Sequence, residues 1–330
     1  MALIEIKNGP AIATIDTVGA QLVSYKINGV EVMFDGATNP DAQWQGSAKN
    51  LFPNPGPVGT ENDVYGKLDK VKLEAREGVV KDHVRYIHNG GYYYMPQHGF
   101  AQFKDFNIQG QTKNSCLLSL THNNDTIREY PYRFKYSVGM EIDREGTIEY
   151  SAFSRNDDNK PMVAGMGWHP AFKLHSDPSQ YKIVLTNLEH DGTCTLEEGV
   201  EYGIDSFVNE GGSQRFGGII SADVSLVYVR EDGKRIPYVQ MHSKAPNLIV
   251  WSKPRENENQ DNFICIEPWN TTPRQINKLT TQDKTRDLAY GKDSAVVLEP
   301  GEVNEMQVYL HINPAYIKEM IKEIEEDMQQ

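Results

Sequence analysis

Apolar and polar residues alternate with a period of two along much of the chain, a pattern that indicates β-strands. In residues 134–142 every second position, beginning with Phe134, carries an apolar side chain. A polar Asp-Arg-Glu-Gly sequence at 143–146 separates this run from a similar run at 147–153. Because a short polar segment with glycine between two such runs is typical of a turn, we predict a β-hairpin here.

Two further hairpins are predicted from turn dipeptides. Asn28-Gly29 and Asp232-Gly233 each lie between two runs rich in apolar residues. Both dipeptides readily adopt the backbone conformation that tight hairpin turns require. Strands flanking these turns, or following them along the chain, are predicted at 22–27, 30–34, 227–230, 237–241, 248–251, 263–267, 295–298 and 306–312.

The order of the predicted elements defines a fold class. Segments with helical periodicity do not alternate with the strands, so parallel α/β folds are disfavoured. No linker-like change in composition divides the chain. We therefore predict an all-β protein, a large antiparallel β-sandwich forming one domain over residues 1–330. Residues 59–91 are charged and interrupt the pattern, either as a helix or as an inserted excursion.

The C-terminal tail is predicted to form a short helix over about 314–330. Its apolar residues recur at helical spacing with charged residues between them; they are Ile317, Met320, Ile321, Ile324 and Met328. This apolar face would dock on the sandwich or contact a second subunit. The protein is accordingly expected to be a monomer or a homodimer.

Composition and charge narrow the function classes. The 330 residues carry a net charge of −13, which repels nucleic acid, and no cluster of basic and aromatic residues compensates for it. No run approaches the roughly 20 apolar residues that span a bilayer, and the N-terminus lacks signal-peptide features. Cys116, Cys194 and Cys265 are odd in number and lack metal-site spacing. We expect a cytoplasmic protein that binds neither nucleic acid nor membrane.

Two histidines lie in unusual local sequences. His98 follows Pro96 where the chain is expected to turn, and loops carry function more often than core positions do. His169 follows two glycines and precedes Pro170, which restricts it to extended conformations and would present a fixed imidazole beside apolar surface. Taken alone, either histidine could equally be a structural residue held by hydrogen bonds.

Glu267 ends a segment that we predict to be buried on both sides. In a strand, Phe263, Cys265 and Glu267 share one face, while Ile264 and Ile266 occupy the other. Burying an unpaired carboxylate is costly, so Glu267 must have partners, a raised pKa, or both. Each outcome suits a general base, although a satisfied glutamate at a strand end remains the alternative.

The ordered combination of these stretches resembles the aldose 1-epimerase (galactose mutarotase) family, closest to its LacX-like branch. The likeness is carried by His-Gly-Phe-Ala at 98–101, Gly-Trp-His-Pro-Ala-Phe at 167–172 and Cys-Ile-Glu-Pro-Trp at 265–269. Shorter motifs extend it over residues 1 to about 312. The resemblance implies a galactose mutarotase-like supersandwich, with the sugar lying across a concave sheet.

The resemblance also implies an activity and its residues. His169 matches the family's general acid, Glu267 its general base and His98 its second, substrate-binding histidine. Opening a hemiacetal ring requires one group that takes the C1 hydroxyl proton and another that gives a proton to the ring oxygen. Reclosure after rotation about C1–C2 then delivers the other anomer of a free hexose such as galactose or glucose. This chemistry requires no metal, redox group or nucleotide, so no cofactor is expected.

Aromatic residues next to these groups are expected to contact the sugar. Trp168, Phe100 or Trp269 would pack against its apolar C–H face. Family members often carry arginines shortly after the Leu-Phe-Pro motif and directly after His-Gly-Phe-Ala, where this chain has 56–58 (Gly-Pro-Val) and Gln102. Such cations bind phosphate oxygens bidentately, so their absence argues against a sugar phosphate. Arg76 or Arg85 could act in place of these arginines. Asp205 is a candidate for the family's substrate-binding aspartate.

Three other classes of function could use some of these residues. A zinc hydrolase would recruit His98, His169 and Glu267, but their spacing fits no local zinc motif. A glycosidase would need two carboxylates flanking the bond, and only Glu267 presents itself. A non-catalytic sugar sensor on the same scaffold is the main alternative, because fold does not determine function; retention of both the acid and the base argues against it.

Overall fold

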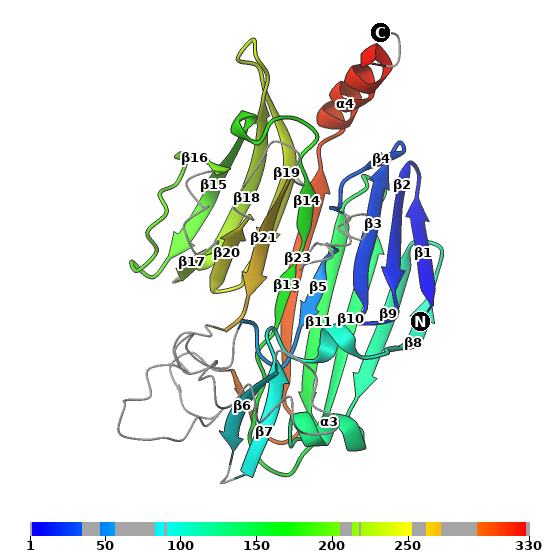
Figure 1. Cartoon of the computed structure of the whole chain (residues 1–330), viewed down its shortest axis with the longest axis vertical. Helices are drawn as coiled ribbons and strands as arrows, with labels where there is room; N and C mark the ends of the chain where they lie inside the picture. The colour runs from blue at the N-terminus through cyan, green and yellow to red at the C-terminus, as the bar shows by residue number, and fades with distance from the viewer. Residues whose placement is uncertain are drawn as a thin grey trace.

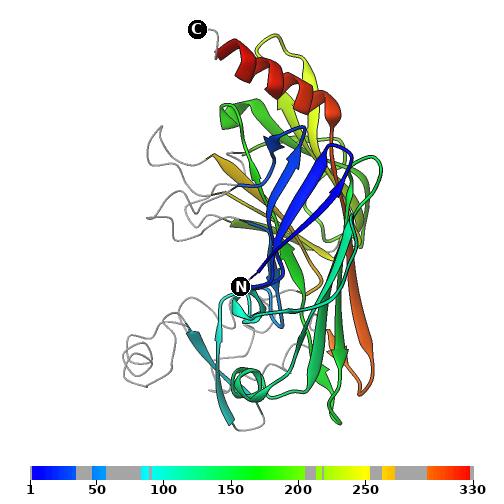
Figure 2. The same cartoon turned by 90° about the vertical axis from the view of Figure 1, so that its right-hand side faces the viewer.

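The computed structural model describes residues 2–34, 47–56, 83–88, 91–204, 213–217, 219–252, 262–271 and 296–327 (Figures 1 and 2). Within these ranges the protein is built mainly of antiparallel strands. The predicted all-β sandwich with a short C-terminal helix is therefore confirmed. No helix in the described ranges is both long and apolar enough to cross a membrane.

The N-terminal sheet shows how alternation in the sequence becomes a buried face. Its strands follow chain order: β1 (Leu3–Asn8), β2 (Ala11–Asp16), β3 (Gln21–Ile27) and β4 (Val30–Glu31). Alternate side chains of β2 are buried, starting with Ala11. Asn28 and Gly29 both have positive φ, which is the conformation expected for the predicted β3–β4 hairpin turn.

The large sheet has the order β16-β15-β18-β19-β23-β11-β10-β9-β8 among the described strands. The predicted hairpins at 134–153 and 227–241 are confirmed as β10–β11 and β18–β19. The bounds are β8 (Asn107–Gln111), β9 (Ser115–Thr121), β10 (Phe134–Ile142), β11 (Ile148–Asn156), β15 (Tyr181–His190), β16 (Glu201–Gly203), β18 (Ile219–Val229), β19 (Arg235–Ser243) and β23 (Val303–Ile312).

The small sheet carries the candidate site and has the order β17-β20-β21-β13-β5, with β14 also paired to β21. Its strands are β5 (Lys49–Leu51), β13 (Gly167–His169), β14 (Ala171–Lys173), β17 (Ser213–Gly217), β20 (Asn247–Trp251) and β21 (Phe263–Trp269). Two further pairs are β12 (Met162–Val163) with β22 (Val297–Leu298), and β6 (His83–His88) with β7 (Gly91–Pro96).

The main core lies between the large sheet on one side and the small and N-terminal sheets on the other (Figure 2). All of β21 is buried, as predicted. Ile264 and Ile266 belong to the main core, whereas Phe263 and Cys265 belong to a separate apolar cluster. The opposite face of β21, which carries Phe263, Cys265 and Glu267, is called the site face below.

The helices are short. α4 (Pro314–Asp327) confirms the predicted C-terminal helix as far as residue 327, and Tyr316, Ile317 and Met320 dock it on the main core. Ile324 is exposed, and Met328 lies outside the described residues. The other helices in the described ranges are α3 (Asn124–Glu129), η2 (Ala101–Phe103) and η3 (Pro178–Gln180). Of the charged segment 59–91, residues 83–88 and 91 are described, and they belong to the β6–β7 hairpin.

Candidate functional site

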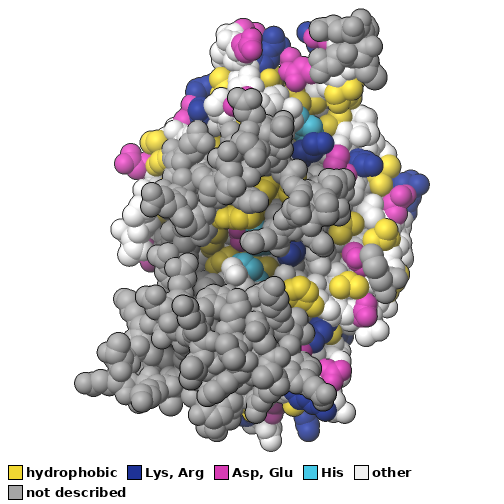
Figure 3. Space-filling model, viewed as in Figure 1, with side chains coloured by type: hydrophobic (Ala, Val, Ile, Leu, Met, Phe, Trp, Pro, Cys, Tyr) yellow, Lys and Arg dark blue, Asp and Glu magenta, His cyan; other side chains and the backbone are white. Residues whose placement is uncertain are grey.

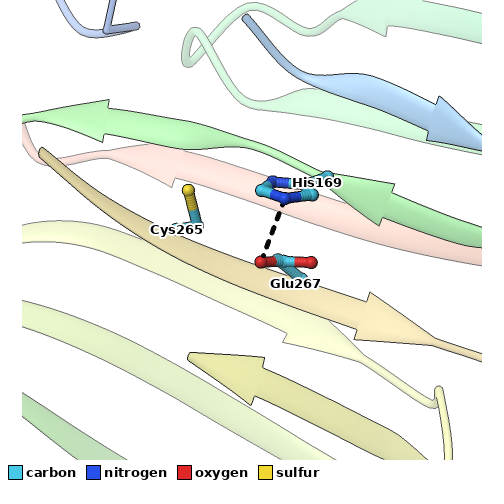
Figure 4. Close-up of side chains that lie close together, drawn as sticks. All are labelled: His169, Cys265 and Glu267. Atoms are coloured by element: carbon cyan, nitrogen blue, oxygen red, sulfur yellow. Dashed lines mark ion pairs between the residues drawn. The ribbon is translucent and has the colours of Figure 1, made fainter. Parts of the chain in front are cut away.

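His169 and Glu267 face each other across two neighbouring strands (Figure 4). β13 and β14 pair with β21 through Gly167 opposite Trp269 and Ala171 opposite Cys265, which puts His169 opposite Glu267 between those pairs. Nε2 of His169 lies 3.3 Å from Oε1 of Glu267. Residues 98 positions apart in the chain therefore form one polar pair on the site face.

The environment of Glu267 favours its protonated form. The residue is 2% exposed, and the indole N–H of Trp269 donates a hydrogen bond to its Oε2 at 3.2 Å. Burial raises the pKa of Glu267 well above its ordinary value, and the Trp269 hydrogen bond opposes this only in part. An isolated ionised carboxylate at this position would be energetically unfavourable, because the surrounding layer is apolar.

The environment of His169 favours its neutral form. Burial lowers the pKa of His169 well below its ordinary value, and the charges of His98 and Lys49 lower it further. Besides the N–H of the neutral imidazole, the pair therefore carries one transferable proton, and this proton rests on the carboxyl group. If it moved to His169, the pair would become an imidazolium and a carboxylate with the same total charge.

His98 lies in a turn between β7 and η2, as predicted, and a ring of local hydrogen bonds fixes it. Its backbone has a φ of 68°, and its N–H donates to the carbonyl of Gly56 at 2.9 Å. In return, the N–H of Gly56 donates to Nδ1 of His98 at 2.9 Å. Because Nδ1 accepts that bond, the neutral ring carries its proton on Nε2. Nε2, which lies 3.2 Å from the side-chain amide of the exposed Gln97, is therefore the donor of this ring.

Gln102 and Gly99 hold this turn in place. The Gln102 side chain points inward and donates to the carbonyls of Gln97 and Gly99 at 2.8 and 3.1 Å. Gly99 has a φ of +75°, and a Cβ there would lie 2.1 Å from the carbonyl oxygen of Phe52, so only glycine fits. At position 102, where family members often carry arginine, this chain uses a neutral amide to brace the His98 turn.

The rings of His98 and Trp269 lie beside the polar pair of His169 and Glu267. The His98 ring lies 5.4 Å from the His169 ring and 5.7 Å from the Trp269 ring, edge to face in both cases. His98 is half-buried, whereas His169 and Trp269 are 5% exposed. His98 thus forms the accessible side of the site. Figure 3 views this face, and a histidine and an acidic side chain lie side by side in a hollow near its centre.

Gly167 is a position of close packing. A Cβ on it would lie 2.7 Å from Cδ1 of Trp269 and 3.1 Å from a methyl group of Leu51. Gly167 lies within β13 and pairs with both neighbouring strands. Its missing side chain leaves room for the Trp269 ring, whose indole N–H donates to Glu267.

Two of the aromatic residues expected to touch the sugar are in the main core. Trp168 is fully buried and stacks on Tyr150 of the large sheet, with ring centroids 4.5 Å apart. Phe100 is also fully buried and packs against Phe52. Trp168 alternates with Gly167 and His169 along β13 and therefore points to the opposite face of the sheet. Neither residue is available to a ligand on the site face, whereas Trp269 is placed there.

Two residues of the site, Lys49 and Trp251, were not singled out from the sequence, and a third, Cys265, was given no role there. Lys49 pairs with His169 across β5 and β13, and it affects the pKa values of His98, His169 and Cys265. Trp251 lies 6.2 Å from His169, ring to ring, and is half-buried. Cys265 shares the site face with Glu267. Their strands were predictable, but the pairing that brings Lys49 and Trp251 beside His169 carries no local signal in the sequence.

The structure does not describe the side chains of the other candidates. Arg76 and Asp205 lie outside the described residues, and Arg85 belongs to β6. Among the described residues, His169, Cys265 and Glu267 form a set whose ligand atoms lie within 4.8 Å of one another. That set differs from the His98, His169 and Glu267 trio considered from the sequence, because Cys265 takes the place of His98.

Comparison with known proteins identifies the fold. The structure is similar to that of a galactose mutarotase related enzyme from Lactobacillus acidophilus, with 22% identity, a TM-score of 0.70, and coverage of 94% of this chain and 97% of the other. A galactose mutarotase-like protein from Lactobacillus casei shows 20% identity, a TM-score of 0.68, and coverage of 94% and 100%. A galactose 1-epimerase from Lactobacillus acidophilus shows 13% identity, a TM-score of 0.57, and coverage of 94% and 95%. The protein therefore has a galactose mutarotase-like fold.

The sequence itself points to the same family. Residues 81–218, which include His98 and His169, match the family model described as aldose 1-epimerase. The search of curated proteins found no match. The resemblance to the aldose 1-epimerase family that we predicted from the sequence motifs is therefore confirmed.

Proposed function

We propose that the protein is an aldose 1-epimerase that interconverts the α and β anomers of a free hexose by acid–base ring opening and reclosure. The observation that carries this proposal is the pairing of His169 and Glu267, 3.3 Å apart on the site face and beside the His98 turn. A carboxyl group and an imidazole that share one proton can exchange it through a substrate bound between them.

The geometry of the reaction calls for such a pair. The hydroxyl oxygen and the ring oxygen that exchange protons are both bonded to C1, so the two catalytic groups must be near neighbours. Glu267 takes the proton of the C1 hydroxyl while His169 gives a proton to the ring oxygen. The C1–O5 bond opens, C1–C2 rotates, and the ring recloses with both transfers reversed. No proton is gained or lost overall.

Before ring opening, substrate binding must favour transfer of the shared proton from Glu267 to His169. Ring opening starts with the proton on His169 and ends with it on Glu267, which is its resting position in the buried pair. Sugar hydroxyls that donate to the Glu267 carboxylate favour its charged form, because hydrogen bonds to a carboxylate lower its pKa. Binding a sugar therefore prepares the base for the first transfer.

The surrounding residues supply recognition. The Nε2–H of His98 would donate to the ring oxygen or a neighbouring hydroxyl and would orient the sugar; the Gly56 hydrogen bond to Nδ1 supports this tautomer. Trp269, together with half-buried Trp251, offers aromatic surface to the C–H face of a sugar. Gln102 stands where family members often carry an arginine, which supports a free sugar over a sugar phosphate as the substrate.

The remaining expectations stay predictions. They are a single domain, a cytoplasmic location, a monomer or homodimer, and no binding of nucleic acid or membrane.

Freshly dissolved α-glucose and α-galactose test the function. The protein should speed the approach to anomeric equilibrium, followed by polarimetry or by NMR of the anomeric protons. A rate equal to that of buffer across several aldoses, with sugar binding still detectable, would favour the non-catalytic sugar sensor instead.

A further inference from the structure

Cys265 adds a third metal-type donor to the acid–base pair (Figure 4). Its side chain and that of Glu267 lie on the same face of β21, two residues apart, and His169 faces them from β13. The thiol sulfur, an imidazole nitrogen and a carboxylate oxygen lie within 4.8 Å of one another, and all three residues are buried. The proposed acid–base reaction makes no use of the thiol.

The donor types select for particular ions. Zinc binds Cys sulfur at about 2.3 Å and His nitrogen or carboxylate oxygen at about 2.0–2.2 Å, with preferred tetrahedral geometry. Modest side-chain adjustment would bring the three donors around one ion, and a fourth position would stay open to water or a sugar hydroxyl. Magnesium and calcium prefer oxygen ligands, so a sulfur–nitrogen–oxygen set favours zinc or cadmium over them.

Charge also fits a divalent ion. A thiolate and a carboxylate balance its two positive charges, which leaves a neutral complex in a buried layer. The thiol and the Glu267 carboxyl each lose a proton when the ion binds, so up to two protons are released. Burial and the neighbouring Glu267 raise the pKa of the Cys265 thiol well above its ordinary value, and the charge of Lys49 opposes this only in part while it also repels the ion. Affinity is therefore expected to be moderate.

We propose that His169, Cys265 and Glu267 form an inhibitory site for Zn²⁺ or Cd²⁺. The bound ion occupies the nitrogen and oxygen atoms that would transfer protons, so metal binding and catalysis exclude each other. Binding stands on the geometry of the three donors alone, whereas inhibition rests on the proposed epimerase function. A chelator distinguishes this inhibitory ion from a resident catalytic metal, because removing a catalytic metal would abolish activity instead of restoring it.

Cobalt(II) titration tests the site without reference to activity. The full-length wild-type protein should bind one Co²⁺, with the ultraviolet charge-transfer band of a thiolate ligand, and Zn²⁺ should displace it while Mg²⁺ does not. Cys265→Ala and Cys265→Ser should weaken binding about 100-fold or more, because even outer-shell changes at zinc sites cost 10–100-fold. Cys194→Ser is the matched control, since Cys194 is half-buried and outside this cluster, and it should bind Co²⁺ as the wild type does.

Activity provides the second arm. Zn²⁺ should slow anomerisation by the wild type and by Cys194→Ser, EDTA should restore the rate, and Cys265→Ala should resist Zn²⁺. Absence of Co²⁺ binding in the wild type, or binding retained by both Cys265 variants with their fold intact by circular dichroism, would overturn the site. Metal binding that depends on Cys265 in a protein without epimerase activity would uphold the site and refute the proposed function instead.

Discussion

Nε2 of His169 lies 3.3 Å from Oε1 of Glu267, and the two residues reach this contact from neighbouring strands rather than from one loop. Strands of a packed sheet hold side chains more rigidly than loops do, which suits a reaction in which both groups serve oxygens on the same carbon. Prolines follow each residue, Pro170 after His169 and Pro268 after Glu267, so neither following position donates a ladder hydrogen bond.

Glu267→Gln should remove most of the epimerase activity and leave the fold intact. Burial already favours a neutral carboxyl group at this position, so an amide of the same shape keeps the Trp269 hydrogen bond without adding a buried charge. General acid–base catalysis contributes roughly 10²- to 10⁴-fold, and a loss in this range is expected. Polarimetry of fresh α-glucose provides the measurement, with thermal melting to check the fold. Activity within twofold of the wild type would remove Glu267 from the mechanism.

His169→Asn should give a similar loss, and the double variant should lose little more than either single one. Residues that transfer one shared proton act as a unit, so their effects are strongly non-additive. Rates of the two single variants and the double variant, measured under the same conditions, test this. Multiplicative losses would indicate that the two groups act in separate steps.

His98→Gln should raise KM about tenfold with a smaller change in kcat, because His98 is assigned to binding and orientation. Initial rates over a range of sugar concentrations separate the two constants. His122→Gln is a suitable control, since His122 is half-buried and bonds the carbonyl of Phe134 in the large sheet. A fall in kcat at unchanged KM would instead give His98 a direct part in proton transfer.

Gly167→Ala should disturb the site by displacing Trp269. The new methyl group would lie 2.7 Å from the indole ring, and overpacking of this kind costs about 1–3 kcal/mol. We expect a lower melting temperature, altered tryptophan fluorescence and reduced epimerase activity. Gly110→Ala is the control, because a Cβ there meets nothing within 4 Å. Equal behaviour of the two variants would contradict the packing role of Gly167.

Asn50→Leu should destabilise the protein by roughly 2–3 kcal/mol, since it leaves buried polar groups without partners. The Asn50 amide donates to the carbonyls of Gly19 and Ala20 at 2.8 and 2.6 Å, and its oxygen accepts from the Tyr150 hydroxyl at 2.6 Å. It thereby links the small sheet to the N-terminal and large sheets. Tyr150→Phe removes one of these bonds and should cost about 1 kcal/mol. Urea unfolding measures both values, and an unchanged midpoint for Asn50→Leu would contradict the linking role.

Stability should fall as the pH drops from about 6.5 towards 4, in part because of His175. Burial lowers the pKa of His175 from 6.5 to about 4, so in this window the unfolded chain binds a proton that the folded protein does not. The contribution is fully present above pH 6.5, is lost progressively below it, and is on the order of 3 kcal/mol at most.

The hydrogen bonds of His175 explain this preference for the neutral ring. Nε2 donates to the carbonyl of Glu31, and Nδ1 accepts from the hydroxyl of Tyr316, which anchors α4. His175→Gln keeps an uncharged donor and acceptor, so its stability should change less between pH 6.5 and 4.5. Urea unfolding of both proteins at each pH measures the difference. Parallel curves would show that His175 does not contribute to the pH dependence.

Much of the architecture follows from local sequence. Alternation at 134–142, the Asn28-Gly29 and Asp232-Gly233 turns and the helical spacing after Pro314 each correspond to an observed element. The same is true of the burial of Glu267 and of the turn at His98. These features depend on backbone preference and on which residues share a face, and both are properties of short segments.

The composition of the site was decided by tertiary structure. Trp168 directly precedes His169 and Trp269 lies two residues after Glu267, yet Trp168 fills the main core and Trp269 lies on the site face. Both faces of the small sheet are apolar, so the sequence of a strand does not show which face meets the core and which meets a ligand. Lys49 and Trp251 joined the site through pairing between strands distant in the chain. That pairing is set by how whole sheets pack, because burial on the scale of the domain determines which distant strands become neighbours.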